Sequence, residues 1–243
     1  MTILPGIRYC AQSDVGARRA NEDAFFADTA GRLHVFAVAD GLGGHAGGRT
    51  ASAMAIAALK DAIRSGAGRS DPPLLLREVF KRANSDILAY NLERGLNAGT
   101  TLVAAVIDRQ NRCCIANTGD SRAYIVTDDS IWHTTDHSIV QNLIDQGIID
   151  ADQAMMHPQK NILTEALGLS GQFRIDIDDR SAEDAILLLS SDGLHGYVQD
   201  TRLLQILRSA EPDEACAALI AEAKRAGSTD NITVIVARTA PPR

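Results

Sequence analysis

The sequence predicts an α+β fold in which helices pack on antiparallel sheets. Two observations carry this prediction. Strand-like segments follow one another closely in the middle of the chain with no helix between them, which requires antiparallel pairing. Two consecutive helical patterns precede these segments and another follows near the C-terminus, so strands and helices do not alternate regularly.

The N-terminal part of the chain predicts three strands. Residues 7–14 and 23–29 have strand-like composition and flank a charged turn at 15–22. Residues 33–38 are β-branched, aromatic or small, which is typical of a short buried strand. We therefore expect the chain to begin with strands before its first helix.

Two helices are expected next. Thr50 is the predicted N-cap of the first, and Gly66 and Gly68 are expected to end it. The second is expected to start at Asp71, with Pro72 as its first residue. Its apolar stripe comprises Leu75, Val79, Ala83, Ile87 and Tyr90.

The middle of the chain predicts a β meander followed by an insertion. The expected strands are separated by polar turns and lie at 101–107, 112–118, 122–126 and 131–133. Residues 136–170 are polar, lack a strong apolar stripe and are expected to be mostly helical.

Two more strands, a helix and a last strand complete the prediction. The strict alternation of Phe173, Ile175 and Ile177 predicts a strand with one wet face. The continuous apolar run 186–189 predicts a strand that is buried on both faces. A helix is expected from about Pro212 to Gly227, followed by a strand at 232–236. No repeat or linker interrupts the sequence, so we expect one domain over residues 1–243.

Composition and charge exclude several classes of function. A chain of 243 residues with 45% hydrophobic and 23% charged residues can bury a large core. Its net charge of −7 argues against nucleic acid or an anionic membrane as the main partner. No apolar run reaches the roughly 18 residues of a membrane span, and no signal peptide is recognisable. The four cysteines show no C-x-x-C spacing, so we expect reduced thiols in a cytoplasmic protein.

Four aspartates occupy the same kind of place, at the end or the start of an apolar strand beside Gly, Ser or Asn. These are Asp40, Asp120, Asp192 and Asp230. Carboxylates gathered at the ends of adjoining strands repel one another unless cations hold them. Ligands that are all oxygen favour hard ions, Mg²⁺ or Mn²⁺. Each aspartate alone is equally typical of a turn or a helix cap.

The glycines after Asp40 have two further interpretations. Gly41, Gly43 and Ala46 match a G-x-G-x-x-A dinucleotide fingerprint. The charge of Asp40 opposes it, and no second strand follows within the roughly 30 residues of a βαβ unit. A plain glycine-rich turn between strand and helix is the simpler alternative.

Eight short motifs in order then resemble one family. They are SDVGARRANEDA (13–24), DGLGGHAGG (40–48), GTT (99–101), NTGDSRAY (117–124), TDHS (135–138), LTEALG (163–168), SDGL (191–194) and DNIT (230–233). Together they are similar to the metal-dependent protein phosphatases of type 2C in their compact bacterial form. The resemblance implies a four-layer sandwich: two antiparallel β-sheets flanked by α-helices on both faces.

The resemblance also implies roles for individual residues. Asp40 is expected to bridge two metal ions, the Gly41 carbonyl to bind one, and Asp192 and Asp230 to bind one ion together. Glu22 and Asp23 are expected to bind a metal directly or through its waters. Asp120 is expected to hold a third ion, weakly or not at all, because Gly196 stands where many relatives carry an acidic residue.

The resemblance also implies a role in substrate binding for two further parts of the chain, and it leaves one catalytic role of the family unfilled. Arg18 is expected to contact the substrate phosphate, a task that suits a guanidinium fork. Leu42 stands where eukaryotic relatives carry a histidine proposed as general acid. Residues 136–170 are expected to form a flap beside the site.

The function implied is hydrolysis of phosphoserine and phosphothreonine in proteins by a hydroxide bridging two Mn²⁺ or Mg²⁺ ions. Phosphorylated proteins, a cognate serine/threonine kinase and its substrates are the expected partners. Two alternatives stay open at this point. One is a catalytically weak module of the same fold that binds phosphoproteins and regulates, and the other is a two-metal hydrolase of a small phosphoester.

Overall fold

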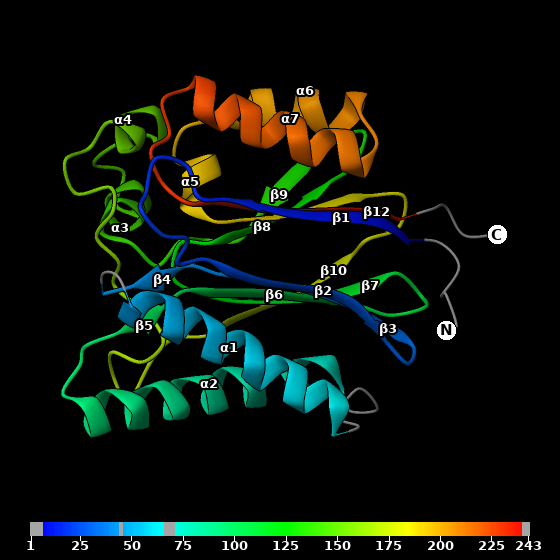
Figure 1. Cartoon of the computed structure of the whole chain (residues 1–243). Coiled ribbons are helices and arrows are strands. Elements are labelled where there is room, and N and C mark those ends of the chain that lie inside the picture. Colours follow the sequence, from blue (N-terminus) through cyan, green and yellow to red (C-terminus); the bar gives the residue numbers. More distant parts are fainter. Residues whose placement is uncertain (1–6, 44–45, 66–70, 240–243) are drawn as a thin grey trace.

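Two five-stranded antiparallel sheets pack face to face in the computed structural model, which describes residues 7–43, 46–65 and 71–239. Figure 1 shows them as the two central layers. The first sheet has the order β1 (Ile7–Asp14), β12 (Ile232–Thr239), β11 (Ile186–Ser190), β8 (Arg122–Val126), β9 (Ile131–His133). The second has the order β10 (Asp176–Ser181), β7 (Arg112–Thr118), β6 (Leu102–Ile107), β3 (Leu33–Ala39), β2 (Ala24–Ala30). A small pair joins β4 (Gly41–Leu42) to β5 (Gly99–Thr100).

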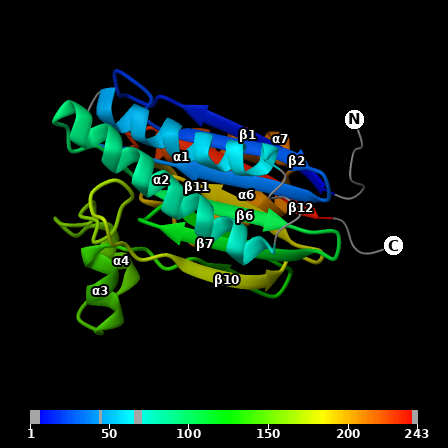
Figure 2. The same cartoon turned by 90° about the horizontal axis from the view of Figure 1, so that it is seen from below.

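Helices cover both outer faces of the sandwich. On the second sheet lie α1 (Ala46–Arg64) and α2 (Pro72–Arg94), which Figure 2 shows from below. On the first sheet lie α5 (Asp192–His195), α6 (Asp200–Ser209) and α7 (Pro212–Arg225). Two short helices, α3 (Ile139–Asp145) and α4 (Ala151–Met155), project at one end of the sandwich.

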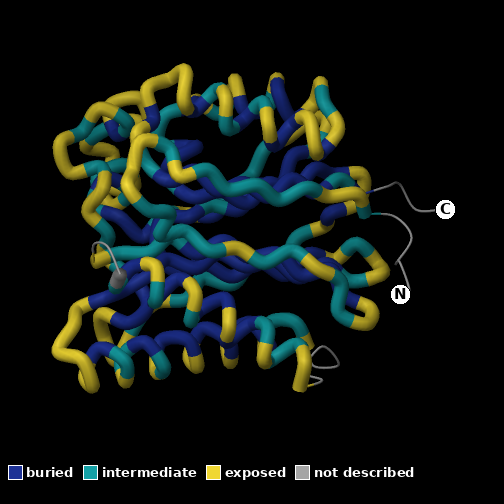
Figure 3. Tube along the Cα trace, in the orientation of Figure 1, coloured by how far each residue is buried: buried dark blue, intermediate teal, exposed yellow. Residues whose placement is uncertain are grey.

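Three apolar cores correspond to the three interfaces between these four layers. In β3, Val35 and Ala37 face the helices α1 and α2, whereas Phe36 and Val38 face the other sheet. The strand β11 alternates in the same way, with Leu187 turned to the interior of the sandwich. Both strands are buried along their whole length, and Figure 3 shows the interior of the sandwich largely in the dark blue of buried residues. The α-β-β-α sandwich and the doubly buried strand at 186–189 are therefore confirmed.

The expected four-strand meander is wrong. The strands β6 and β7 pair with each other, but residues 119–121 carry the chain across the sandwich, and β8 and β9 belong to the opposite sheet. Cys113 and Ile115 of β7 and Ala123 and Ile125 of β8 share the core between the sheets. Adjacent strands face each other here instead of pairing, because each sheet needs an apolar surface to cover its inner face.

The expected helix N-cap at Thr50 is also wrong, because α1 begins at Ala46. Glycines in the first turn of a helix cost stability, but Gly48 lies where a Cβ would come within 2.2 Å of a Glu22 carboxylate oxygen. Close packing against the neighbouring loop therefore outweighs helix propensity. Gly44, Gly66 and Gly68 lie outside the described residues.

Three other segments differ from expectation. The strand β10 begins at Asp176, after Phe173 and Ile175, because it pairs with β7 only from Asn117 onward. Residues 136–170, which we call the flap segment, contain only the two short helices α3 and α4 and are otherwise irregular. The helix α6 was not expected.

Candidate functional site

A hollow of about 250 Å³ opens at one end of the sandwich, the end where α5 begins (Figure 1). Carboxylates reach it from both sheets. Asp40 follows β3, Asp120 lies in the crossover after β7, Asp192 follows β11 and Asp230 precedes β12. The structure thus brings together the four aspartates that the sequence placed at strand ends. Also lining the hollow are Arg18, Glu22 and Gly41.

The backbone of Asp40 is fixed by two threonines of the GTT motif. Its N–H donates to the Thr101 hydroxyl at 2.9 Å, and its carbonyl accepts from the Thr101 N–H at 2.9 Å and from the Thr100 hydroxyl at 2.8 Å. Both threonines are fully buried. The carboxylate of Asp40 therefore projects from a rigid backbone.

Close backbone contact brings Asp192 and Asp230 together. Gly193 lies where a Cβ would come within 2.0 Å of the Asn231 carbonyl, so only glycine lets the two loops meet. Ser191 reinforces the contact, because its N–H donates to the Thr233 carbonyl at 3.1 Å and its hydroxyl accepts from the Thr233 N–H at 3.0 Å. The SDGL and DNIT motifs are thus two halves of one loop contact.

Asn231 connects the charged turn at 15–22 to this site. Its side-chain amide donates to the carbonyls of Val15 and Ala20, and its side-chain oxygen accepts from the Glu22 N–H at 2.7 Å. Sequence reasoning included Asn231 in a motif but gave it no role. A single asparagine carries no signal of its position in space, so only the motif could have drawn attention to it.

Burial and mutual repulsion raise the pKa values of the carboxyl groups. Burial raises the pKa of Asp40 well above its ordinary value, and the charges of Asp23 and Asp192 raise it further. Burial also raises the pKa of Asp23 and of Asp192 to about 6. The pKa of Asp120 lies well above its ordinary value, again because of burial and then of Asp192. These carboxylates are costly to ionise together.

Two of these carboxylates each keep one oxygen without a hydrogen-bond partner. The hydroxyls of Ser191 and Thr233 both donate to the same oxygen of Asp23, Oδ2. Its other oxygen, Oδ1, is buried without a partner, and so is Oδ1 of Asp192. Within the described residues, no three His, Cys, Asp or Glu side chains already form a cage for an ion. Buried unpaired carboxylate oxygens beside the hollow nevertheless fit a hard cation completed by waters and a carbonyl.

Arg18 lies on the rim of the hollow, paired with a carboxylate of the site. Its guanidinium donates to Asp230 Oδ2 at 2.7 Å, and 58% of its side chain is exposed. The pKa of Arg18 is raised first by this hydrogen bond and then by the charge of Asp230. An exposed ion pair of this kind contributes little to stability, so Arg18 can leave Asp230 for another anion at small cost.

A family model described as protein phosphatase 2C matches residues 12–219 of this chain. The chain belongs to the protein phosphatase 2C family. The serine/threonine phosphatase stp of Listeria monocytogenes is 39% identical to this family member over 208 residues, which cover 82% of each chain. The serine/threonine protein phosphatase PstP of Mycobacterium tuberculosis is 37% identical over 95% of this chain and 45% of that one.

A solved structure supports the same grouping. The catalytic domain of PstP, in complex with two manganese ions, superposes on this protein phosphatase 2C member with a TM-score of 0.86. The two chains are 35% identical, and the match covers 97% of this one and 99% of that one. In the described parts of the present chain, every helix is too short or too polar to cross a membrane.

His195 is a residue of this phosphatase fold that sequence reasoning missed. It is buried, and burial keeps its pKa well below the ordinary value, so the imidazole is neutral. In the matching tautomer its Nε2–H donates to the Asp120 carbonyl at 3.0 Å, and its Nδ1 accepts from the Ser190 hydroxyl at 2.9 Å. His195 therefore fixes the turn that carries Asp120. At the next position, Gly196, a Cβ would lie 2.7 Å from the Asp192 carbonyl, so the backbone would have to shift to accept an acidic residue.

Proposed function

We propose that this chain is a metal-dependent protein serine/threonine phosphatase that hydrolyses phosphoserine and phosphothreonine esters. The observation that carries the proposal is the buried carboxylate cluster, in which Asp23 and Asp192 keep unpaired oxygens beside an open hollow. A cluster of this kind is destabilising at neutral pH unless cations bind it. Membership of the protein phosphatase 2C family supports the same reaction.

The proposed metal ligands come from five loops that converge on the hollow. They are Asp40, the Gly41 carbonyl, Asp192 and Asp230, with Glu22 and Asp23 holding a metal directly or through water, and Asp120 holding a weak third ion. Mn²⁺ or Mg²⁺ in such a site lowers the pKa of water and offsets the charge that grows on a phosphoryl group. Residues 1–243 are proposed to act as one catalytic domain, with the flap segment beside the site.

The residues of this chain hold the proposed metal ligands and the substrate phosphate in position. Thr100 and Thr101 hold Asp40 rigidly, and the contact of Gly193 with Asn231 sets the spacing between Asp192 and Asp230. Arg18 exchanges its pairing with Asp230 for the substrate phosphate, which its planar fork binds through two parallel hydrogen bonds. Its exposure on the rim leaves room for this exchange.

Phosphorylated proteins are the substrates implied by the family. A cognate serine/threonine kinase is the partner that would supply them, because dephosphorylation requires a kinase that acts on the same residues. The cysteines described are all free thiols, which agrees with the reducing cytoplasm that we propose as the compartment. No specific observation favours a silent regulatory module over an enzyme.

Phosphate release from a phosphothreonine peptide tests this function. Purified protein with Mn²⁺ should release phosphate, and complete chelation should lower turnover at least about 1000-fold, because bound metal supplies several kcal/mol of transition-state stabilisation. Turnover that survives chelation would exclude the metal mechanism. Binding of the peptide without phosphate release would favour the regulatory module, and hydrolysis of small phosphoesters alone would favour a different substrate class.

A further inference from the structure

A second and larger cavity, of about 560 Å³, adjoins the carboxylate hollow. The two share part of their walls, since Asp120, Asn161, Asp192 and Asp230 line both. A volume of this size is typical of pockets that enclose a sizeable ligand. A phosphorylated side chain placed at the carboxylates would therefore have its neighbouring residues beside or inside this cavity.

The cavity lies between the flap segment and the chain from α5 to the start of α6. Val140, Ile144 and Met155 of the flap segment form one apolar wall. Tyr197 and Val198 contribute apolar surface on the opposite side. An aliphatic stem can lie against both walls and bury apolar surface there.

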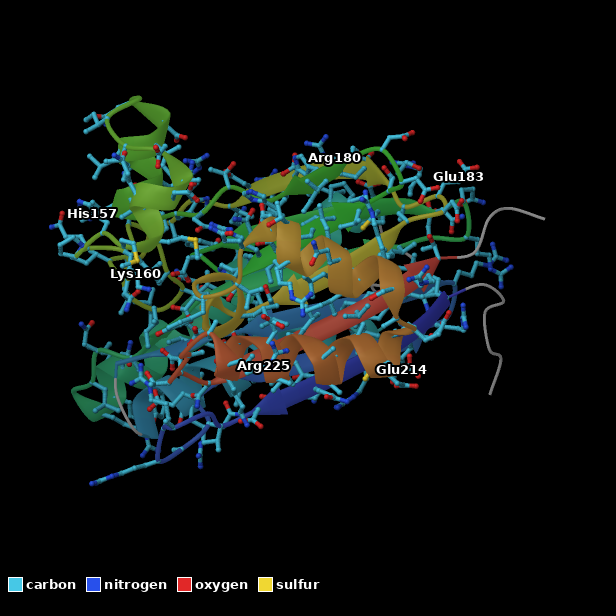
Figure 4. The ribbon with its side chains drawn as sticks, turned by 90° about the horizontal axis from the view of Figure 1, so that it is seen from above. His157, Lys160, Arg180, Glu183, Glu214 and Arg225 are labelled. Carbon is cyan, nitrogen blue, oxygen red and sulfur yellow. The ribbon has the colours of Figure 1, made fainter. Side chains whose placement is uncertain are left out.

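Two of the charged groups that line this cavity match each other. Arg122 and Asp136 form a bidentate ion pair, with N–O distances of 2.7 and 2.8 Å. Lys160 extends from the flap segment (Figure 4), and its ammonium lies 4.7 Å from the centre of the Tyr197 ring. Lys160 lines this cavity, and its charge acts on the carboxylate of Asp192.

Two carboxylates of the lining that lie outside the proposed metal site are unmatched. Asp152 lies in the first turn of α4 and Asp200 is the first residue of α6, and among the described residues neither has a cation within ion-pair distance. Neither lines the smaller hollow where the phosphate is proposed to bind. Both line a cavity that also has apolar walls, and such a surface complements a long basic side chain.

We infer that this cavity binds a lysine or arginine side chain near the phosphorylated residue of the substrate, its stem on the apolar walls and its charge at Asp152 and Asp200. This inference rests on the proposed function. It makes phosphoproteins with basic residues near the phosphorylation site the preferred substrate class. An acidic residue in the same place would be repelled.

A competing account assigns both aspartates to helix stability. An acidic residue in the first turn interacts favourably with the helix dipole, by about 0.3–1 kcal/mol. That account predicts a lower melting temperature when either residue loses its charge, with no change in the choice among peptides. The inference instead predicts that the choice among peptides changes when these residues lose their charge, so the two accounts are separable by experiment.

The test uses phosphothreonine peptides that differ only by lysine, alanine or glutamate at one flanking position, scanned over three residues on each side. The full chain is assayed with saturating Mn²⁺, and the readout is the ratio of kcat/KM for the lysine and glutamate peptides. At one or more positions the wild-type ratio should be at least about 10, the scale of one charge contact worth 1.4 kcal/mol. In Asp152→Asn/Asp200→Asn it should approach one, and Asp200→Asn alone should lower it partly.

Asp129→Asn is the matched control, because Asp129 is an exposed loop residue outside the cavity and its loss of charge is the same. It should keep the wild-type ratio. Hydrolysis of all peptides at equal rates, or a ratio unchanged in the cavity variants, would overturn the inference while the proposed function stands. Absence of phosphate release from every peptide with Mn²⁺ would instead overturn the proposed function and the inference together.

Discussion

Buried charges lie in two neighbouring places at the same end of the sandwich, and the two sets differ in whether other groups of the protein compensate them. Arg122 and Asp136 satisfy each other: the guanidinium donates two hydrogen bonds to the carboxylate and another to the Tyr124 hydroxyl. The carboxylate cluster around Asp40 has no such internal partner. Asp23 and Asp192 keep unpaired oxygens, and the cation that pairs directly with this cluster in the described part of the chain, Arg18 on Asp230, is largely exposed.

This difference separates a structural charge from a functional one. A buried ion pair that is complete within the chain needs nothing from solution and fixes β8 to the flap segment. A buried cluster of one sign is destabilising unless something else binds it. The incomplete site is therefore the one that depends on a ligand, and the complete one depends on both of its residues being present.

Breaking the complete pair should have the largest effect on folding. Asp136→Ala leaves the Arg122 guanidinium buried without its partner, and we expect the free energy of unfolding to fall by about 3–5 kcal/mol. Chemical denaturation measures it. The matched control is Asp179→Ala, which breaks the exposed pair with Arg112 and should cost much less, because solvent screens an exposed ion pair. Equal losses in the two variants would show that the buried pair has no special structural role.

Removing a charge from the incomplete cluster should affect catalysis instead. Asp192→Asn or Asp230→Asn should lower turnover with saturating Mn²⁺ at least about 100-fold, the scale of losing one main electrostatic element. The metal-free variants should fold as well as the wild type, because each relieves carboxylate repulsion. Circular dichroism and phosphate release measure the two properties. A variant that keeps nearly wild-type turnover would show that its residue is not a metal ligand.

The same contrast explains what the sequence could predict. Four aspartates lie at strand ends, which is a local pattern in the sequence: Asp40, Asp120, Asp192 and Asp230. A local pattern of this kind is still present in the folded structure. The Arg18–Asp230 pair joins residues that are 212 positions apart. The contacts of Asn231 with the 15–22 turn and of His195 with the Asp120 carbonyl, 75 positions away, are also long-range. The periodicity of residue types along the sequence carries no information about such contacts.

The fold, too, has features that the local sequence predicts and features that it does not predict. Strand positions followed from composition, since buried strands such as β3 and β11 are continuous apolar runs. Composition did not predict which sheet each strand joins, because a three-residue turn after β7 can either form a hairpin or cross the sandwich. The start of α1 was missed because Gly48 is chosen for its contact with Glu22 rather than for helix formation.

The smallest predicted effect is a pH dependence of the metal-free protein that belongs to the cluster alone. The pKa of Asp192 is about 6 in the folded state and 3.8 as an unperturbed group. Between these values the folded state binds more protons than the unfolded state, so this carboxyl lowers stability as pH rises through that window. From pH 5 to pH 7 the loss should be roughly 1 kcal/mol.

Comparison of the wild type with Asp192→Asn isolates this effect. His195 acts in the opposite direction, since its lowered pKa keeps it neutral when folded while the unfolded histidine gains a proton below about pH 6.5. That contribution is present in both proteins and cancels in their difference. Denaturation of both metal-free proteins at pH 5 and pH 7 should therefore show the wild type losing about 1 kcal/mol relative to the variant on going to pH 7. Parallel pH dependences would mean that Asp192 is already relieved of its neighbours' charge without any cation, and the contrast between the two sets of buried charges would no longer hold.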